Sequence, residues 1–395
     1  MAITIFFFWA SLAILFYCYF GYGILVFLIN TFRKPFISEK KKFQSVPVFH
    51  VTIIISAYNE EEVLEQKIKN TLAIEYPVDK IQIIFITDGS TDDSAQIVEQ
   101  YPQITLLHQS ERKGKYAAIK RAMQKVNTPI VVFSDANTVL NKECIKKIIP
   151  HYGDVKVGAV AGEKKIINNQ EISSAGEAER LYWKYESFMK KLDAGLNTVT
   201  GVAGELFSIR TDLFKALDDE VILDDFIISM QICMRGYKIA YEPGAFATEL
   251  PSASLAEEEK RKVRISAGAW QSIGYLKDCL NIFKNPLLAF QLFSRKIFRW
   301  IICPPLLVLF LITNILIVIR FPESEIYRLV LYAHTGFYFL AFCGWMIVRF
   351  GKKAGIFTIP FYFVFMNYCL IKGFVKFMKG QQSVLWERSL RQAVE

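Results

Sequence analysis

The sequence contains little cysteine, proline and glycine: 7, 13 and 21 of its 395 residues. So few of each exclude a disulfide-stapled scaffold, a collagen-like repeat and a disordered chain. No G-x-G-x-x-G motif follows the first strand-like run and no G-x-x-x-x-G-K-[ST] motif is present, which disfavours a Rossmann dinucleotide site and a P-loop NTPase. The cysteines show no C-x-x-C spacing, so we expect no redox or metal chemistry from them.

Charged residues are also few, 22% against 52% hydrophobic, and the apolar excess is concentrated at the two ends. Residues 3–29 carry no charge and exceed the roughly 20 residues that cross a bilayer. The basic residues Arg33, Lys34 and 40–42 follow them, so we expect a retained membrane anchor with the N-terminus outside and the basic flank cytoplasmic. Three more apolar segments lie near the other end, at residues 300–319, 327–348 and 355–378.

The last apolar segment is interrupted by Pro360, Asn367, Lys372 and Lys376. If it spans the bilayer, the tail 379–395 lies outside, whereas the basic residues of the tail nearest the membrane favour the inside. Counting spans and counting charges therefore disagree. A tilted, re-entrant or interfacial last helix would reconcile the two counts.

Between the apolar ends, strand-like and helical patterns alternate. Apolar β-branched runs predict strands at residues 51–56, 81–87, 104–107 and 129–134, and helical periods predict helices at 60–72, 90–101 and 115–126. This alternation predicts an α/β domain with a doubly wound, mainly parallel sheet. Such sheets bind ligands at the carboxyl ends of their strands, where polar clusters stand at residues 57–60, 88–93 and 135–137.

Acids in these clusters suggest a nucleotide and a metal. Asp88 could accept from a base or a ribose hydroxyl, whereas residues 90–93 are typical of a helix N-cap. Asp135 and Asn137, spaced two apart at a strand end, could share one Mg²⁺ or Mn²⁺ that bridges a diphosphate, although such a pair is often only a turn.

Two further sites carry charge. Lys115, in the basic stretch 112–115, could meet a phosphate, or the stretch could be a solvated loop. Asp224 and Asp225 precede an apolar helix, where one of them could be a general base or both could cap the helix.

Taken together, six motifs resemble one family in their order along the chain: S-A-Y-N-E (56–60), D-G-S-T-D (88–92), G-K-Y-A-A (114–118), F-S-D-A-N-T (133–138), T-G-V-A-G-E-L-F-S-I-R (200–210) and L-D-D (223–225). The set is similar to the family 2 inverting glycosyltransferases of GT-A fold, whose membrane-embedded branch includes cellulose, chitin and hyaluronan synthases. The apolar ends agree with that branch.

The resemblance implies roles for individual residues. The nucleotide-sugar pocket would be lined by Ala57, Tyr58, Glu60, Asp88, Lys115 and Ser134, with Asp88 on a uracil. Asp135 would hold Mg²⁺ or Mn²⁺ with Asn137 beside it, and Asp225, preceded by Asp224, would be the catalytic base. The acceptor and diphosphate side would comprise Gly201, Gly204, Glu205, Arg264, Trp270 and Gln271, with the Arg on the diphosphate and the Trp on an acceptor sugar.

The chain departs from the family pattern in three places. Thr87 stands where many members have a first Asp, and Asn137 where many have Asp, so the metal would depend mainly on Asp135 and phosphate oxygens. Processive synthases carry Q-x-x-R-W, whereas residues 260–271 supply the same residue types in another arrangement. Processive and single-sugar transfer therefore both stay open. Residues 257–262 have the pattern of a solvated, charged helix face.

We expect five parts: an N-terminal anchor (1–33), a cytoplasmic GT-A domain (34–285), an amphipathic interface helix with Lys and Arg at the headgroups (286–299), a C-terminal membrane region (300–378) and a tail (379–395). The net charge of +9 is then placed at membrane boundaries and beside a diphosphate rather than on nucleic acid.

The expected function is transfer of a sugar from a nucleotide diphosphate, with a UDP-sugar as the expected donor, to a glycan or lipid-linked acceptor at the plasma membrane in exopolysaccharide synthesis. One alternative is a non-processive transferase that adds one sugar to a polyprenyl or other lipid. A non-enzymatic alternative is a membrane protein that senses a nucleotide sugar. The donor sugar, the protein partners and the oligomeric state are not encoded in any motif.

Overall fold

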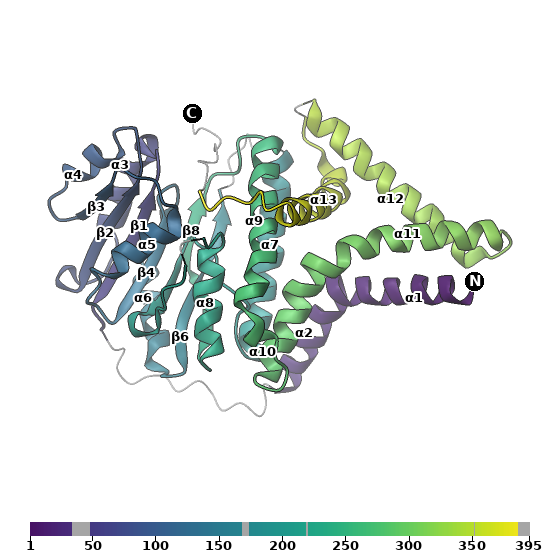
Figure 1. The fold of residues 1–395 in the computed structure, drawn as a ribbon, viewed down its shortest axis with the longest axis horizontal. Coiled ribbons are helices and arrows are strands. Elements are labelled where there is room, and N and C mark those ends of the chain that lie inside the picture. Colours follow the sequence, from purple (N-terminus) through teal and green to yellow (C-terminus); the bar gives the residue numbers. More distant parts are fainter. Residues whose placement is uncertain (34–47, 168–173, 219, 351, 386–395) are drawn as a thin grey trace.

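The computed structural model describes residues 1–33, 48–167, 174–218, 220–350 and 352–385. An α/β part stands beside an arm of long apolar helices, with the N-terminus at the far end of that arm (Figure 1). The basic residues 40–42 and the end of the predicted tail, 386–395, lie outside the described residues.

The α/β part is built on one eight-stranded sheet with the order β3-β2-β1-β4-β7-β6-β8-β5. Its strands are β1 (Val51–Ala57), β2 (Ile81–Asp88), β3 (Thr105–Gln109), β4 (Ile130–Asp135), β5 (Val139–Leu140), β6 (Val157–Ile166), β7 (Phe207–Arg210) and β8 (Lys238–Glu249). Strands β3, β2, β1 and β4 pair in parallel, as predicted, and β7 is antiparallel to β4 and β6. The sheet is therefore mixed, with a parallel half that carries the predicted motifs.

Successive residues of the central strands alternate between two cores, one on each face of the sheet. Ile54 and Ile84 face one core, packed by α5 (Lys115–Met123) and α8 (Asp224–Met234). Ile53 and Phe85 face the other, packed by α3 (Glu61–Leu72), α4 (Ser94–Glu99) and α6 (Cys144–Ile148). Because both faces are covered, the strands read as continuous apolar runs rather than as alternating ones.

Two long helices connect the sheet with the arm: α7 (Ser174–Leu196) and α9 (Leu255–Tyr275). In Figure 1 they stand side by side between the sheet and the apolar helices. Ser254 caps α9 by accepting from the Glu257 amide at 3.2 Å, which explains where this helix begins.

Four helical stretches are long and apolar enough to cross a membrane, at 2–33, 286–320, 325–349 and 355–378. They contain α1 (Ala2–Phe16), α2 (Tyr22–Arg33), α10 (Pro286–Leu292), α11 (Cys303–Arg320), α12 (Glu325–Arg349) and α13 (Thr358–Met378). A π-helical segment, Phe293–Ile302, joins α10 to α11 without a break, so the structure has no separate interface helix that ends at 299.

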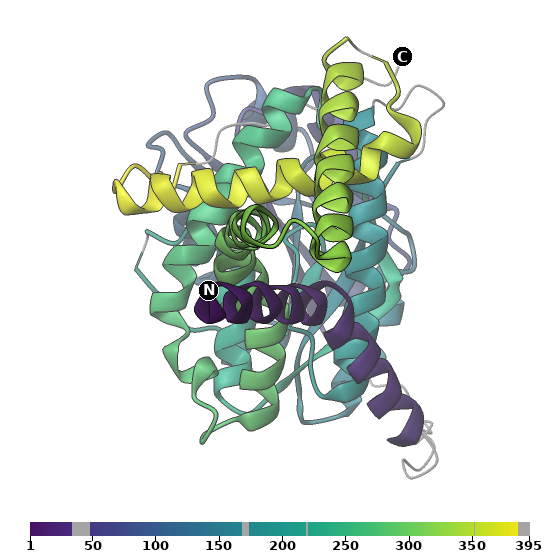
Figure 2. The ribbon, with the colours of Figure 1, turned by 90° about the vertical axis from the view of Figure 1, so that its right-hand side faces the viewer.

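The last apolar helix runs in a different direction from the others. Helix α11 lies lengthwise in Figure 1 and is seen end-on in Figure 2, whereas α13 is end-on in Figure 1 and lengthwise in Figure 2. The two helices therefore lie crosswise. If α11 crosses a bilayer, α13 lies along its surface, which is one of the three arrangements that would reconcile the span count with the charge count.

A glycine allows α13 to pack closely against α9. A Cβ at Gly373 would lie 2.3 Å from the Cβ of Ser266, and the Ser266 hydroxyl donates to the Leu370 carbonyl at 3.0 Å. The crossing of these two helices thus depends on the missing side chain.

We expect Gly373→Ala to lower the free energy of unfolding by about 1–3 kcal/mol, because the added methyl group forces α13 away from α9. Gly274→Ala is the matched control, since no atom lies within 4 Å of a Cβ built there on the same helix α9. Thermal unfolding of both variants in detergent tests this. Equal midpoints for the two variants would contradict the close crossing.

Candidate functional site

The carboxyl ends of the parallel strands bring the predicted polar clusters together. Strand β1 lies between β2 and β4, and Ser56 of β1 is in register with Asp135, the last residue of β4. The acids that follow these strands therefore share one edge of the sheet, where doubly wound sheets bind ligands.

A cavity of about 320 Å³ opens at this edge and extends to the long helices, a volume within the range of small-molecule sites. Among its walls are these predicted residues: Glu60, Lys115, Asp135, Asn137, Gly201, Gly204, Glu205, Asp224, Asp225 and Arg264. These residues come from five separate motifs and from α9, so the fold assembles most of the predicted site in one place.

Three charged groups converge on Gly204 inside the cavity. A Cβ at this glycine would lie 3.2 Å from the Lys115 ammonium, 3.4 Å from Asp225 Oδ2 and 3.6 Å from Asp135 Oδ2. Lys115 Nζ also pairs with Asp135 Oδ1 at 2.6 Å and approaches Asp224 Oδ2 at 3.9 Å. Although burial alone would lower it, these carboxylates raise the pKa of Lys115, so the ammonium stays charged.

Asp224 and Asp225 occupy the first turn of α8, where the helix dipole favours negative charge. Asp225 Oδ1 accepts from the Phe226 amide at 2.7 Å, while Asp224 Oδ2 is buried without a hydrogen-bond partner. Burial, and then the adjacent Asp224 carboxylate, raise the pKa of Asp225 to about 7 against the opposing effect of Lys115. A carboxylate with such a pKa is suited to take a proton near neutral pH.

The residues at this point fit a divalent cation that is shared with a diphosphate. Across the part of the chain that the structure describes, no three His, Cys, Asp or Glu side chains are grouped to hold a metal alone. Asp135 nevertheless points a carboxylate into the cavity, beside the open space at Gly204. One carboxylate with phosphate oxygens and water is an ordinary set of ligands for Mg²⁺. The Asn137 amide donates to Glu249 Oε1 at 3.2 Å, so its NH₂ group faces a neighbouring acid.

Several predicted nucleotide residues are not among those that line the cavity. Ala57 is buried at the end of β1, and the Arg112 guanidinium covers the Tyr58 ring at 3.6 Å. The buried Asp88 carboxylate accepts from the amides of Lys113 and Gly114, the latter at 2.7 Å, and so fastens the loop that precedes α5. Contact of these side chains with a nucleotide stays a prediction.

The Ser134 side chain stabilises the loop after β4 and does not line the cavity. The ammonium of the fully buried Lys67 donates to Ser134 Oγ at 2.7 Å and to the Thr138 carbonyl at 2.9 Å. Ser134 Oγ is also 3.0 Å from the Glu205 carbonyl. Lys67 thus fixes both sides of the loop that carries Asp135, a role that was missed. Its position on the apolar face of α3, between Leu64 and Ile68, was the available signal.

Trp270 and Gln271 do not line the cavity. The Trp270 ring packs on Phe374 and Phe377 of α13, with centroids 4.6 and 6.3 Å away, so its predicted contact with an acceptor sugar finds no support there. Gln271 accepts from the Ile222 amide at 3.0 Å and donates to the Glu220 carbonyl at 2.6 Å. Gln271 therefore holds the segment that leads into Asp224.

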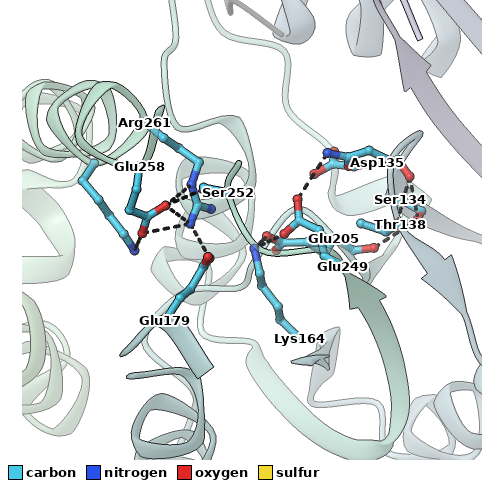
Figure 3. Close-up of polar contacts among 12 residues, drawn as sticks. Ser134, Asp135, Thr138, Lys164, Glu179, Glu205, Glu249, Ser252, Glu258 and Arg261 are labelled. Carbon is cyan, nitrogen blue, oxygen red and sulfur yellow. Dashed lines mark hydrogen bonds and ion pairs between the residues drawn. The ribbon is translucent and has the colours of Figure 1, made fainter. Parts of the chain in front are cut away.

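Glu205 belongs to a buried ion pair with a lysine that was not predicted. Lys164 lies between Glu205 and Glu249, with ion pairs to both (Figure 3). Burial would raise the pKa of Glu205, but Lys164 lowers it to about 2, so the carboxylate stays ionised. This pair joins β6 and β8 to the loop that carries Gly204.

A second buried ion network corrects the prediction of a solvated helix face at 257–262. Glu258 is 1% exposed and pairs with Arg261 at 2.9 Å and Lys262 at 3.4 Å, and Arg261 also pairs with Glu179 of α7 (Figure 3). The Tyr362 hydroxyl of α13 donates to Glu258 at 3.0 Å. These contacts tie α7, α9 and α13 together beside the cavity.

The sequence interpretation also missed one whole wall of the cavity. Helix α7 contributes Tyr182, Trp183, Glu186 and Lys190. Residues 179, 183, 186 and 190 follow the i, i+4, i+7, i+11 spacing of one helix face, which was the available signal.

The basic residues of the π-helical segment form the adjoining wall. They were predicted at lipid headgroups, but Arg295 is 4% exposed and pairs with Glu186 and Asp193 at 3.0 Å each. Arg299 pairs with Glu186 at 2.6 Å. The segment therefore turns its charge inward because buried acids of α7 face it.

The comparisons with known proteins agree with this geometry. The profile of the family described as "Glycosyltransferase like family 2" matches residues 47–268. Poly-beta-1,6-N-acetyl-D-glucosamine synthases of Staphylococcus aureus strain COL and Staphylococcus epidermidis are 27% and 25% identical, over 60% and 65% of this chain. The matched part spans 58% and 63% of those proteins.

One solved structure shares the whole architecture. The mannosyltransferase PcManGT from Pyrobaculum calidifontis, in complex with GDP-Man and Mn²⁺, covers 95% of this chain and is itself covered completely, with a TM-score of 0.68 and 19% sequence identity. This likeness shows the fold, a GT-A-like sheet with membrane helices, which confirms the predicted fold class.

We expect Arg261→Met to lower the free energy of unfolding by about 3–5 kcal/mol, because it leaves Glu258 and Glu179 buried without their shared cation. Lys284→Met is the control, since the Lys284–Asp278 pair is more than half exposed and contributes at most about 1 kcal/mol. Chemical unfolding followed by circular dichroism distinguishes the two. Similar midpoints would show that the network is not a buried one.

Proposed function

Because the chain belongs to glycosyltransferase family 2, we propose that it transfers a sugar from a nucleotide diphosphate to an acceptor hydroxyl with inversion at the anomeric carbon. The convergence of Lys115, Asp135 and Asp225 around Gly204 carries this proposal. It places a base, a cation and a metal-binding carboxylate within a few ångströms of one open point in the cavity.

In the proposed reaction the Asp225 carboxylate takes the proton of the acceptor hydroxyl, whose oxygen attacks the anomeric carbon. The bond from that carbon to the diphosphate oxygen breaks on the opposite face, and the electron pair leaves with the diphosphate. Lys115 offsets the charge that develops on the leaving group. Arg264 lines the same cavity with its Nε unpaired, and its side chain is in reach to do the same.

Asp135 is the residue that would hold the divalent cation, with Asn137 beside it. The bound cation would supply positive charge to the departing diphosphate. Mg²⁺ and Mn²⁺ both suit an oxygen donor set with few protein ligands.

For the donor we propose a UDP-sugar, and for the setting exopolysaccharide synthesis. The staphylococcal relatives are named for a polymer of N-acetylglucosamine, so UDP-N-acetylglucosamine is the first donor to test. Since those relatives are matched over less than two thirds of their length, polymer formation is not carried over, and addition of a single sugar to a lipid is the second candidate.

We further propose that the α/β domain, near residues 34–285, faces the cytoplasm below a membrane region formed by residues 1–33 and 286–349. The N-terminus then lies outside, because the basic residues follow the first span. Helix α13 lies on the inner surface, crosswise to α11, with Lys376 in its last turn available to headgroups. This places the 379–395 tail inside.

Asp225→Asn is the direct test of the enzyme. We expect the rate of sugar transfer to fall by about 10²–10⁴-fold, because the amide has no capacity to take the proton. The measurement is UDP release from UDP-N-acetylglucosamine, UDP-glucose, UDP-glucuronate and UDP-galactose with Mn²⁺. Asp278→Asn, at an exposed acid, is the control. Full activity in a folded Asp225→Asn protein would contradict the proposal. If the unaltered protein releases UDP from none of these donors, the result would favour the alternative of a membrane protein that senses a nucleotide sugar.

The pH profile tests the coupling between the two adjacent acids. The base acts when deprotonated, so kcat/KM rises as pH increases through the pKa of Asp225, about 7. Asp224→Asn removes the negative charge that helps to raise this pKa, so the acid limb moves to lower pH. An acid limb that stays in place, or moves to higher pH, would exclude Asp225 as the titrating base.

A further inference from the structure

The cavity has a second charged region that the proposed chemistry does not use. Its walls away from the carboxylates are formed by α7, α9, α13 and the π-helical segment. Lys190 of α7 and Lys296 of the π-helical segment both line this region. We call these two lysines the phosphate subsite, for the reasons that follow.

Positive charge exceeds negative charge at this place. Glu186 and Asp193 are matched by Arg295, and Arg299 also pairs with Glu186. Lys296 reaches Glu186 only at 4.0 Å, and within the described part of the chain Lys190 has no carboxylate at ion-pair distance. Four cations therefore face two carboxylates, which leaves two ammonium groups without a counter-ion of their own.

Burial makes this excess unfavourable until an anion enters. Lys190 is 7% exposed, and burial lowers its pKa although Glu186, Glu205 and Asp225 oppose the shift. A buried ammonium is stabilised by a partner that brings negative charge and hydrogen-bond acceptors, and lysine is a common phosphate ligand. Lys190, Lys296 and Asp225 line the same cavity, so an anion at the subsite shares that cavity with the proposed base.

The neighbouring wall is apolar and belongs to the membrane-side helices. Met366, Cys369 and Leu370 of α13 and Trp300 beside Lys296 line the same cavity. The Ser266–Leu370 hydrogen bond fixes this part of α13 on α9. An occupant with a phosphate at the lysines would thus meet apolar side chains of a helix that lies at the bilayer surface.

We propose that Lys190 and Lys296 bind the phosphate of the acceptor, and that the acceptor is a saccharide joined to a lipid through phosphate, rather than the neutral end of a polysaccharide. This inference rests on the proposed glycosyltransferase function and names its acceptor class. The phosphate is bound at the subsite, the chain extends along α13, and the acceptor hydroxyl reaches Asp225. No bond to the phosphate of the acceptor is made or broken.

A binding experiment with the full chain in detergent tests the subsite without relying on turnover. The probes are geranylgeranyl phosphate, geranylgeraniol and inorganic phosphate, followed by the fluorescence of the cavity tryptophans Trp183 and Trp300. We expect the lipid phosphate to bind at least about tenfold more tightly than either other probe. Lys190→Met and Lys296→Met each weaken it by about 10- to 100-fold, as expected for loss of a charged hydrogen bond. Lys191→Met, an exposed neighbour on α7, is the control and binds as the unaltered protein does.

Each other outcome overturns the inference. If geranylgeraniol binds as tightly as geranylgeranyl phosphate, the phosphate is not recognised. If inorganic phosphate binds as tightly, the lipid chain is not recognised. If the two lysine variants instead lose binding of UDP while keeping the lipid phosphate, the lysines belong to the donor. UDP release from nucleotide sugars is measured in parallel, so a protein that releases UDP but ignores the lipid phosphate refutes the subsite alone.

Discussion

Arg295, buried between Glu186 and Asp193, is the contact on which the joining of the two parts depends. Both acids stand on α7 of the α/β part, whereas the guanidinium comes from the stretch that continues into α11. Neither the acids nor the cation could be buried alone without a large penalty. The Tyr22 hydroxyl of α2 donates to the same Asp193 carboxylate at 2.5 Å, so the N-terminal and C-terminal apolar helices are fixed to one side chain. A cavity can therefore be shared between the sheet and the membrane helices.

Local patterns determined which parts of this architecture could be predicted from the sequence. The runs at 51–56, 81–87 and 129–134 are buried on both faces, so composition alone identified β1, β2 and β4, and the end of β4 located Asp135. Asp225, in the first turn of α8, was identified by the family resemblance. The apolar helices were identified from the length of their uncharged, apolar runs. The sequence did not predict the burial of Glu186, Lys164 and Glu258, because a charged residue is expected at the surface unless its partner is known. Their partners lie far away along the chain, as with Glu186 and Arg295 or Glu258 and Tyr362.

The same dependence on long-range contacts explains why the sequence did not reveal the neighbours of Trp270 and Gln271. Their residue types matched a family motif, but α9 turns Trp270 toward α13 and Gln271 toward the segment before Asp224. The residue type indicates which contacts a side chain can make, and the helix face on which it lies determines which neighbour it contacts. Arg264 faces the cavity because it lies on another face of the same helix.

The charges of the cavity follow one arrangement. Negative groups gather at the strand ends, where Lys115 and an added cation can offset them, and positive groups gather toward the helices that meet the membrane. In the proposed reaction a nucleotide sugar brings its diphosphate to the first region, so a neutral acceptor would leave the second region uncompensated. An acceptor that carries its own anion satisfies both regions at once. Asp225 and Lys190 line one cavity, so in this proposal an acceptor held at the lysines has its hydroxyl in the cavity that contains the base. Under this proposal, recognition of the acceptor and removal of its proton take place in one cavity that the sheet and the apolar helices share.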